Sequence, residues 1–386
     1  MVFNNAEKIV DYATYVKSLN LIKFDFAMAK EGLKGFNYYQ NFKSVKKQYA
    51  EYLKKYKPLM VNVVNRILKL FSGFLKDYNY MVILNGSFAR NSYREFSDID
   101  VSFVLTKKKT KAFVVFEELF YYALTYVLGI GRERMHSIFN RFVVFDKQRD
   151  YDNEVVLSWA DGKNITYHIK EKAAYELYLS CASERSYQML LGAIEKQIND
   201  DVVSQMAYSY EVLFNNTEYN LENDIMAIEF KNRKNFNMPK YDIVMSNLKR
   251  AYVTRDLKVI IKDLFQNDLY EFASYVRHYL VRKNNYRKLL DLNEVFDSSL
   301  FGTILGKNQK KLKDNYHEYL FYLTRLEMCL NKVDVELSSH DETFIDCNRL
   351  QKFYEVKFKS NEEVLDKLFR IIADNREIYK SALASL

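Results

Sequence analysis

Apolar positions along the chain form two patterns, short continuous runs and longer stretches with helical spacing. Residues 80–84, Tyr-Met-Val-Ile-Leu, have the length of a buried strand, and residues 97–105 form a second strand-like run. Three more strands are expected at 141–146, 154–159 and 164–169. Asp161 and Gly162 separate the last two runs, and an Asp-Gly pair in this position is a strong hairpin signal.

Helical spacing dominates both ends of the chain. Residues 1 to about 75 are expected to be helical, with Pro58 opening a helix over 59–76, because proline is tolerated in a first helical turn. An apolar helix is expected over 110–128. Beyond residue 170, the expected helices are 172–199, 201–214, 241–265, 268–292, 309–331 and 361–384, with polar loops at 215–223 and 232–239.

These elements predict an α+β fold. The chain has 386 residues, a length that favours two or three domains, and its Pro 2 and Gly 10 are too few for many tight turns. Hydrophobic residues make up 48% of the chain, which is enough for sizeable cores. We expect a helical segment at 1–76, a core with a small mixed β-sheet at 77–172, and a large all-helical region at 173–386.

Charge and cysteine content narrow the class of protein. The net charge of +8 is moderately basic, which fits a nucleotide or nucleic-acid ligand. The basic stretches 42–57 and 277–288 either contact phosphate groups or form the solvent-exposed face of a helix. Cys181, Cys329 and Cys347 are widely spaced and match neither a disulfide framework nor a zinc site, which favours a reducing compartment. No apolar run approaches the ~20 residues of a membrane span and no signal-peptide layout opens the chain, so a cytoplasmic protein without a membrane partner is expected.

The segment between the first two strands carries the candidate chemistry. Gly86 and Ser87 end the first strand, where glycine lets the backbone approach a ligand and the N–H groups that start the next helix suit anionic oxygens. About ten residues later, Asp98 and Asp100 flank Ile99 on the second strand. Because side chains alternate along a strand, the two carboxylates point to the same side. They form either a solvated strand face or the ligands of a hard divalent cation such as Mg²⁺, shared with substrate phosphates.

This arrangement resembles the signature of the DNA polymerase β superfamily of nucleotidyltransferases. The signature consists of a strand, a Gly-Ser pair, a spacer of about ten residues and Asp-apolar-Asp-apolar, in this order. Arg90 closely follows the Gly-Ser pair and Ser97 precedes the first Asp. With these two residues the motif is most similar to the branch of protein-PII uridylyltransferases, antibiotic nucleotidyltransferases and bacterial cyclic-oligonucleotide synthases. The resemblance covers residues 78–106 and extends more loosely to residue 172.

The resemblance implies a nucleotidyltransferase core that moves a nucleoside monophosphate from ATP or another nucleoside triphosphate to an acceptor hydroxyl. Pyrophosphate would be released, and the acceptor would be a protein, a small molecule or an RNA 3′ end. Asp98 and Asp100 would hold Mg²⁺ or Mn²⁺, two ions in all, and act in catalysis. The groups expected to bind the nucleotide are Gly86, Ser87, Arg90 and Ser97, with Arg94 as a further phosphate contact.

The chain departs from the family pattern at the third acidic residue. Many polymerase β relatives carry it on the return strand of a hairpin, but here that strand has Thr166 and His168 and no acid. We expect Asp146 to take this role, with Glu154 or His168 as alternatives, since histidine titrates near neutrality. His168 would otherwise be a hydrogen-bonded histidine of the core. The missing acid also leaves a second function open, that of a catalytically silent relative that binds a nucleotide or a partner.

Overall fold

The fold is described from a computed structural model of the chain. The described residues are 10–33, 42–89, 91, 93, 97, 99–106, 111–130, 135–136, 154–158, 164–168, 186–199, 210–232, 268–269, 272, 276, 299–331 and 361–385. They comprise helices at both ends of the chain, one four-stranded sheet and one two-stranded sheet, which confirms the expected α+β class.

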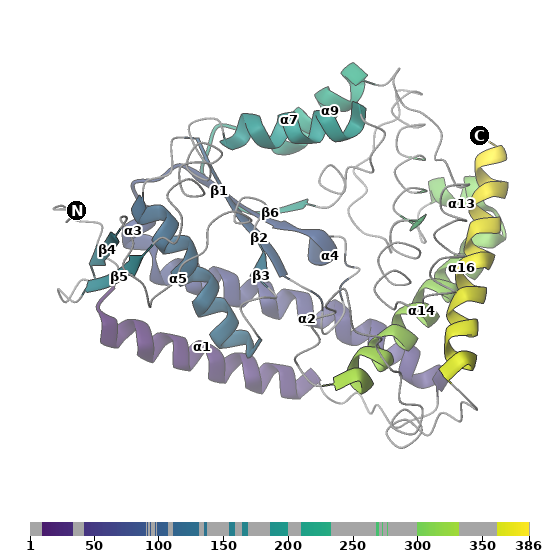
Figure 1. Cartoon of the computed structure of the whole chain (residues 1–386), viewed down its shortest axis with the longest axis horizontal. Coiled ribbons are helices and arrows are strands. Elements are labelled where there is room, and N and C mark those ends of the chain that lie inside the picture. Colours follow the sequence, from purple (N-terminus) through teal and green to yellow (C-terminus); the bar gives the residue numbers. More distant parts are fainter. Residues whose placement is uncertain are drawn as a thin grey trace.

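The four-stranded sheet is mixed and has β1 near its centre (Figure 1). Strand β1 (Tyr80–Asn85) runs antiparallel to β2 (Ile99–Leu105) on one side and to β6 (Tyr210–Asn215) on the other. The short strand β3 (Met135–His136) runs parallel to β2 at the edge. Every residue of β1 is buried, which accounts for its continuous apolar run.

Helices of the N-terminal half pack together beside this sheet. They are α1 (Tyr12–Leu33), α2 (Phe42–Leu70), α3 (Ser72–Leu75) and α5 (Lys111–Leu128). Of these, α5 packs directly on β2. The ring of Phe103 on β2 lies 5.2 Å from that of Phe116 on α5, centroid to centroid. The hydroxyl of Tyr121 donates a hydrogen bond of 2.8 Å to the carbonyl oxygen of Val101. These contacts hold α5 against β2, and the helix expected at 110–128 is confirmed.

Helices α7 (Ser186–Asn199) and α9 (Leu221–Asn232) lie on the opposite side of the sheet from α1 and α2, as Figure 1 shows. The ring of Tyr187 on α7 stacks on Tyr219 with the centroids 4.1 Å apart. Its hydroxyl donates to Oδ2 of Asp224 on α9 over 2.5 Å. Aromatic stacking and a hydrogen bond therefore join the two helices at one end.

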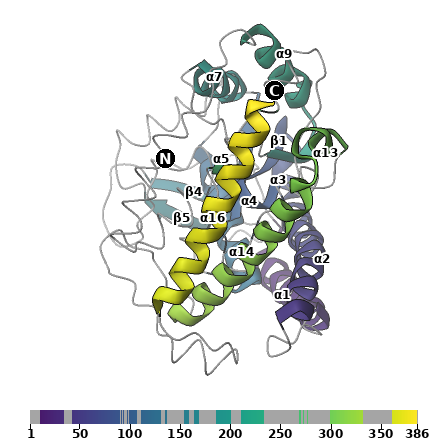
Figure 2. The same cartoon turned by 90° about the vertical axis from the view of Figure 1, so that its right-hand side faces the viewer.

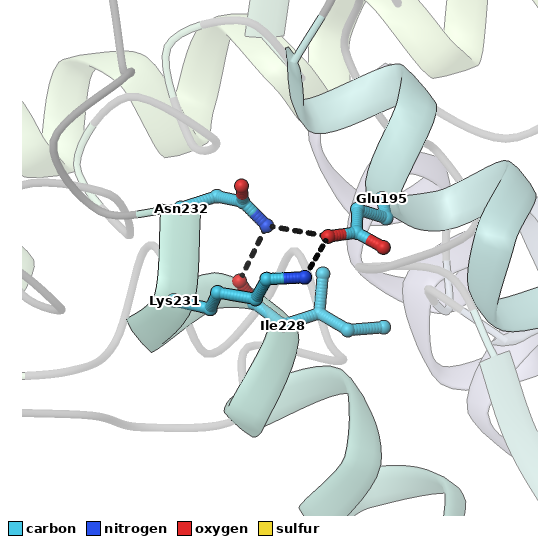
Figure 3. A network of polar contacts seen from close by, with 4 residues as sticks. All are labelled: Glu195, Ile228, Lys231 and Asn232. Carbon is cyan, nitrogen blue, oxygen red and sulfur yellow. Dashed lines mark hydrogen bonds and ion pairs between the residues drawn. The ribbon is translucent and has the colours of Figure 1, made fainter.

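A polar network joins α7 and α9 at their other ends (Figure 3). Oε1 of Glu195 lies 2.8 Å from Nζ of Lys231 and accepts a second hydrogen bond of 3.4 Å from Nδ2 of Asn232. The same Nδ2 donates to the carbonyl oxygen of Ile228 over 3.0 Å. The pKa of the Glu195 carboxyl is lowered, chiefly by the Lys231 hydrogen bond and then by that of Asn232.

The C-terminal helices pack against each other around a buried ion pair. They are α13 (Ser299–Leu305), α14 (Asn308–Asn331) and α16 (Asn361–Ala384), with α14 and α16 side by side in Figures 1 and 2. Nη2 of Arg376 on α16 donates to Oδ1 of Asp268 over 3.2 Å, and its Nε donates to Oδ2. Only 2% of the Arg376 side chain and 4% of the Asp268 side chain are exposed. Across the described helices, none has the combination of length and apolar character needed to cross a membrane.

The expected hairpin is present as a separate sheet. Strands β4 (Glu154–Ser158) and β5 (Asn164–His168) pair antiparallel with each other, apart from the sheet that contains β1 and β2. The α-carbons of Glu154 and His168 are partners in this ladder. Strand β4 lies next to α5, so the hairpin is placed beside that helix.

Two elements differ from the sequence prediction. Residues 201–214 were expected to be helical, yet Tyr210–Asn215 form β6, because pairing with β1 outweighs local helical preference. The strand comes from the region expected to be all-helical, beyond the boundary at 172, and that domain boundary stays a prediction. The loop expected at 215–223 is shorter, since α9 begins at Leu221.

The second difference concerns Pro58. It was expected to open a helix, but it lies inside α2, which continues through it. The backbone N–H of Lys57 donates to the hydroxyl of Tyr93 over 3.0 Å, so a side chain enters the helical ladder at this point. This contact offsets part of the disruption that an internal proline causes.

Several expected elements lie outside the described residues. They are the strand at 141–146, the first part of the helix at 172–199, the helix at 241–265 and most of the helix at 268–292.

Candidate functional site

The turn that ends β1 brings Gly86 against Asp100. Gly86 begins α4 (Gly86–Ala89) with φ +66, a left-handed backbone conformation that glycine adopts without strain. A Cβ atom added at Gly86 would overlap Oδ2 of Asp100 and lie 3.3 Å from its Cγ. The carboxylate of Asp100 therefore lies directly on the glycine backbone, and only glycine leaves room for it.

Asn85, Asp100 and Tyr210 form a row across the same end of the sheet. The α-carbon of Asn85 is the partner of Asp100 on β2 and of Tyr210 on β6. Residues directly opposite each other in antiparallel strands share one face of a sheet. Asn85 is 6% exposed and Tyr210 is 2% exposed, while Asp100 is half-buried. Exposure to solvent therefore increases along the row, from the buried Tyr210 and Asn85 to the half-buried carboxylate of Asp100.

The side-chain amide of Asn85 lacks hydrogen bonds. Among the described residues, neither its Nδ2 nor its Oδ1 has a hydrogen-bond partner, although both atoms are buried. A buried amide without partners costs about 1–3 kcal/mol, so native structures rarely contain one without a reason. This residue ends an otherwise apolar strand next to Gly86 and Asp100.

Helix α2 supports the turn from behind. Nζ of Lys57 donates to Oδ1 of Asn91 over 2.8 Å and lies 2.6 Å from Oε2 of Glu211 on β6. The Lys57 side chain is only 13% exposed. Asn91 has φ 53, a left-handed conformation that asparagine tolerates better than most residues. One lysine therefore links α2, Asn91 beyond the end of α4 and the edge strand β6.

Aromatic rings hold α4 against α2. Phe88 of α4 stacks on Tyr93 with the centroids 4.3 Å apart and the planes at 7°. Tyr56 of α2 contacts both rings, at 6.3 Å from Phe88 and 6.1 Å from Tyr93. The turn at Gly86 is thus fixed by packing before any ligand binds.

The described residues contain only part of the site expected from sequence. Ser87 is half-buried on α4, and Ser97 is buried just before β2. Arg90, Arg94, Asp98 and Asp146 lie outside the described residues. The backbone of His136, which the sequence analysis did not single out, is paired with Asp100 through the α-carbon register of β2 and β3.

The residues present suit a hard metal ion, although they do not complete a site. Within the described ranges, which omit Asp98, no three His, Cys, Asp or Glu side chains form a group that could hold a metal ion. The Asp100 carboxylate is a hard oxygen donor, the type of ligand that Mg²⁺ prefers. The buried Asn85 amide, which has no hydrogen-bond partner among the described residues, and the Asp100 carboxylate against the Gly86 backbone suit a polar ligand at this end of the sheet.

Sequence reasoning missed Lys57, Asn85 and Tyr210. Asn85 had a signal, since it is the one polar residue that ends the apolar run directly before Gly86. Lys57 had none, because it lies in a stretch where every basic residue suits a solvated helix face equally well. Tyr210 belongs to the strand that was expected to be helix.

Comparison with known proteins identifies the domain. Residues 64–174 match the family model of the nucleotidyltransferase domain. Searches of curated proteins and of solved structures find no match. The matched segment includes β1, α4 and β2, and confirms the nucleotidyltransferase domain that the Gly-Ser and Asp-apolar-Asp motif indicated. It is consistent with a polymerase β-like nucleotidyltransferase, and the branch of that superfamily stays a prediction.

Proposed function

We propose that this nucleotidyltransferase domain moves a nucleoside monophosphate from a nucleoside triphosphate to an acceptor hydroxyl and releases pyrophosphate. The observation that carries the proposal is the contact between Asp100 and Gly86, within the segment that matches the family. A carboxylate fixed beside a glycine turn puts a cation ligand next to backbone N–H groups that suit phosphate oxygens.

Asp98 and Asp100 would hold Mg²⁺ or Mn²⁺, two ions in all. Bound there, the metal would neutralise charge on the triphosphate and lower the pKa of the acceptor hydroxyl. The half-buried position of Asp100 supports this role, because the carboxylate is held by the fold and still reaches the surface.

Gly86 and Ser87 would bind the phosphates through their backbone N–H groups and the Ser87 hydroxyl. Arg90 would add charge-assisted hydrogen bonds to the same oxygens, and Ser97 would complete the nucleotide site. The anchoring of α4 on α2 supports this, since phosphate donors that are fixed in advance lose little entropy on binding.

The third acidic group in the proposal is Asp146, with Glu154 or His168 as alternatives. It would accept the proton of the attacking hydroxyl. The β4–β5 hairpin lies beside α5 and is not part of the sheet that contains Asp100. This placement supports Asp146 over Glu154 and His168 as the proposed proton acceptor.

The proposed acceptors are a protein side chain, a small molecule or an RNA 3′ end. The helical regions on either side of the sheet would shape the acceptor site, as the resemblance to uridylyltransferases and antibiotic-modifying enzymes suggests. A second candidate is a catalytically silent relative that binds a nucleotide or a partner, and the return strand without an acid favours it.

Incubation with each α-phosphate-labelled nucleoside triphosphate, Mg²⁺ or Mn²⁺ and cell extract tests the proposal. We expect pyrophosphate release, transfer of label to one acceptor class, and loss of both in the presence of a chelator. Label on protein, on RNA or on a small compound would identify the acceptor. Metal-dependent nucleotide binding without pyrophosphate release toward any acceptor would contradict transfer and support the silent relative.

A further inference from the structure

The side-chain amide of Asn85 has a position that the proposed transfer reaction does not yet explain. We propose that Asn85 is a positioning residue, whose amide holds the Asp100 carboxylate in the orientation that binds the divalent cation. The inference rests on the proposed function, because it assigns Asp100 to metal binding.

The strand register places the two side chains together. Asn85 and Asp100 are direct partners across β1 and β2, so their Cβ atoms share one face at about 4.5–5.5 Å. The structure shows no hydrogen bond between the two side chains, so the proposed one would form when the cation binds. Oδ2 of Asp100 lies against Gly86, the residue that follows Asn85, so the carboxylate is already at the same end of the strand.

The amide makes no hydrogen bond to any described residue, so no structural role is assigned to it. Both polar atoms of Asn85 are buried, and 6% of the residue is exposed. The five preceding residues of β1 are apolar, and a leucine at this position would suit the strand better. Carboxylates that bind metal ions are themselves hydrogen-bonded, and loss of such a partner weakens metal binding about 10–100-fold.

A second asparagine, Asn216, follows β6 and contacts the opposite end of β1, and it provides the matched control. Oδ1 of Asn216 accepts a hydrogen bond of 2.6 Å from the backbone N–H of Tyr80, and its Nδ2 donates to the carbonyl oxygen of Tyr78 over 3.0 Å. Its amide therefore has a structural role, remote from Asp100. Asn85 and Asn216 thus carry the same side chain near opposite ends of β1, Asn85 as the last residue of that strand and Asn216 just after β6, and they differ in what the amide does.

The test measures Mn²⁺ affinity, from the electron paramagnetic resonance signal of free Mn²⁺, and the melting temperature of the same samples. Asn85→Leu should weaken Mn²⁺ binding about tenfold or more while the melting temperature stays equal or rises. Asn216→Leu should lower the melting temperature and leave Mn²⁺ affinity within about twofold. Asn85→Ala, which fits the strand without a larger side chain, should repeat the loss of affinity if Asn85→Leu does not fold.

The outcomes separate this inference from the proposed function. Wild-type protein that binds Mn²⁺, together with folded Asn85 variants that bind it equally well, would overturn the role of Asn85 alone. A lower melting temperature with unchanged affinity in the Asn85 variants would also overturn it, because the amide would then be structural. Wild-type protein that binds no Mn²⁺ would overturn the metal-dependent function and, with it, this inference.

Discussion

Buried polar groups differ in their hydrogen bonding between two regions of the molecule. These regions are the C-terminal helices around Arg376 and the end of the sheet around Gly86. In the helices, Arg376 and Asp268 satisfy each other with two hydrogen bonds, and Asn375 accepts one of 2.9 Å from Asn315. At the end of the sheet, the buried amide of Asn85 has no partner among the described residues, and Gly86 has φ +66. The polar groups of the helical region stabilise the fold, whereas we propose that those at the end of the sheet serve a ligand.

The largest effect expected on stability comes from breaking the Arg376–Asp268 pair. Arg376→Met leaves a buried carboxylate unpaired and should lower the free energy of unfolding by about 3–5 kcal/mol. Thermal unfolding followed by circular dichroism measures this change. Nucleotide and metal affinity of the folded protein should not change, because the pair has no part in the site.

Lys311→Met is the control for that prediction. It removes an ion pair of 3.0 Å with Asp374 in which both side chains are more than half exposed, at 54% and 53%. Exposed pairs contribute little, so the melting temperature should hardly move. Equal losses for the Arg376 and Lys311 variants would show that burial does not distinguish the two pairs.

The next effect concerns Gly86. Gly86→Ala places a Cβ on the Asp100 carboxylate and also strains the backbone, which costs about 1–2 kcal/mol. Displacement of Asp100 should lower the rate of transfer about 10²-fold, or about 3 kcal/mol in transition-state stabilisation. Steady-state kinetics and thermal unfolding separate the two effects.

Gly129 offers a control with the same backbone conformation. It has φ +66 as well, but a Cβ added there meets no atom within 4 Å. Gly129→Ala should therefore lose similar stability and keep its transfer rate. If both alanine variants lose transfer equally, contact with Asp100 is not the reason for glycine at position 86.

A smaller effect is expected from Lys57, which supports the turn without touching the proposed substrate. Lys57→Met removes the contacts to Asn91 and Glu211 and should lower stability by about 1–2 kcal/mol. Because the residues after α4 would be less well held, KM for the triphosphate should rise more than kcat falls. Lys57→Arg should restore most of the KM, and Lys54→Met, on the exposed side of the same helix, should leave it unchanged. Equal changes for the Lys54 and Lys57 variants would contradict a supporting role.

The smallest effect is a pH dependence at the α7–α9 network of Figure 3. The hydrogen bond from Lys231, followed by that from Asn232, lowers the pKa of the Glu195 carboxyl. A lowered pKa in the folded state stabilises the protein above the pKa of the unfolded chain, and this gain is lost as the pH falls through the folded value. Wild-type protein should therefore exceed Glu195→Gln in melting temperature at neutral pH, and the small difference should vanish in acid. A difference that does not vary with pH would contradict this cause.

The sequence was most informative where local chemistry determines structure. The apolar run ending at residue 84, the Gly-Ser turn and the Asp-Gly hairpin each depend on neighbouring residues, and β1, α4 and the β4–β5 pair follow from them. The match of residues 64–174 to the nucleotidyltransferase domain agrees with the motif built on these elements.

The missed features depend on residues far apart in the chain. Strand β6 exists because Tyr210 pairs with Asn85, and a single strand gives no sign of a partner so distant in sequence. Pro58 lies inside α2, where the hydroxyl of the distant Tyr93 accepts the N–H of Lys57. In the sequence, nothing distinguishes Lys57 from the neighbouring lysines. Its contacts with Asn91 and Glu211 become evident only in the structure. Tertiary contacts, and not local preference, decide each of these positions.

The release of pyrophosphate by the Asp98→Ala/Asp100→Ala double variant tests the central claim most directly. Circular dichroism first establishes that the variant keeps its fold. Asp100 is only half-buried, so its replacement by alanine should leave the core intact. The account predicts that release falls by about 10³-fold or more, to the background without protein, because the cation has lost its carboxylates. A folded double variant that releases pyrophosphate at the wild-type rate would contradict the account.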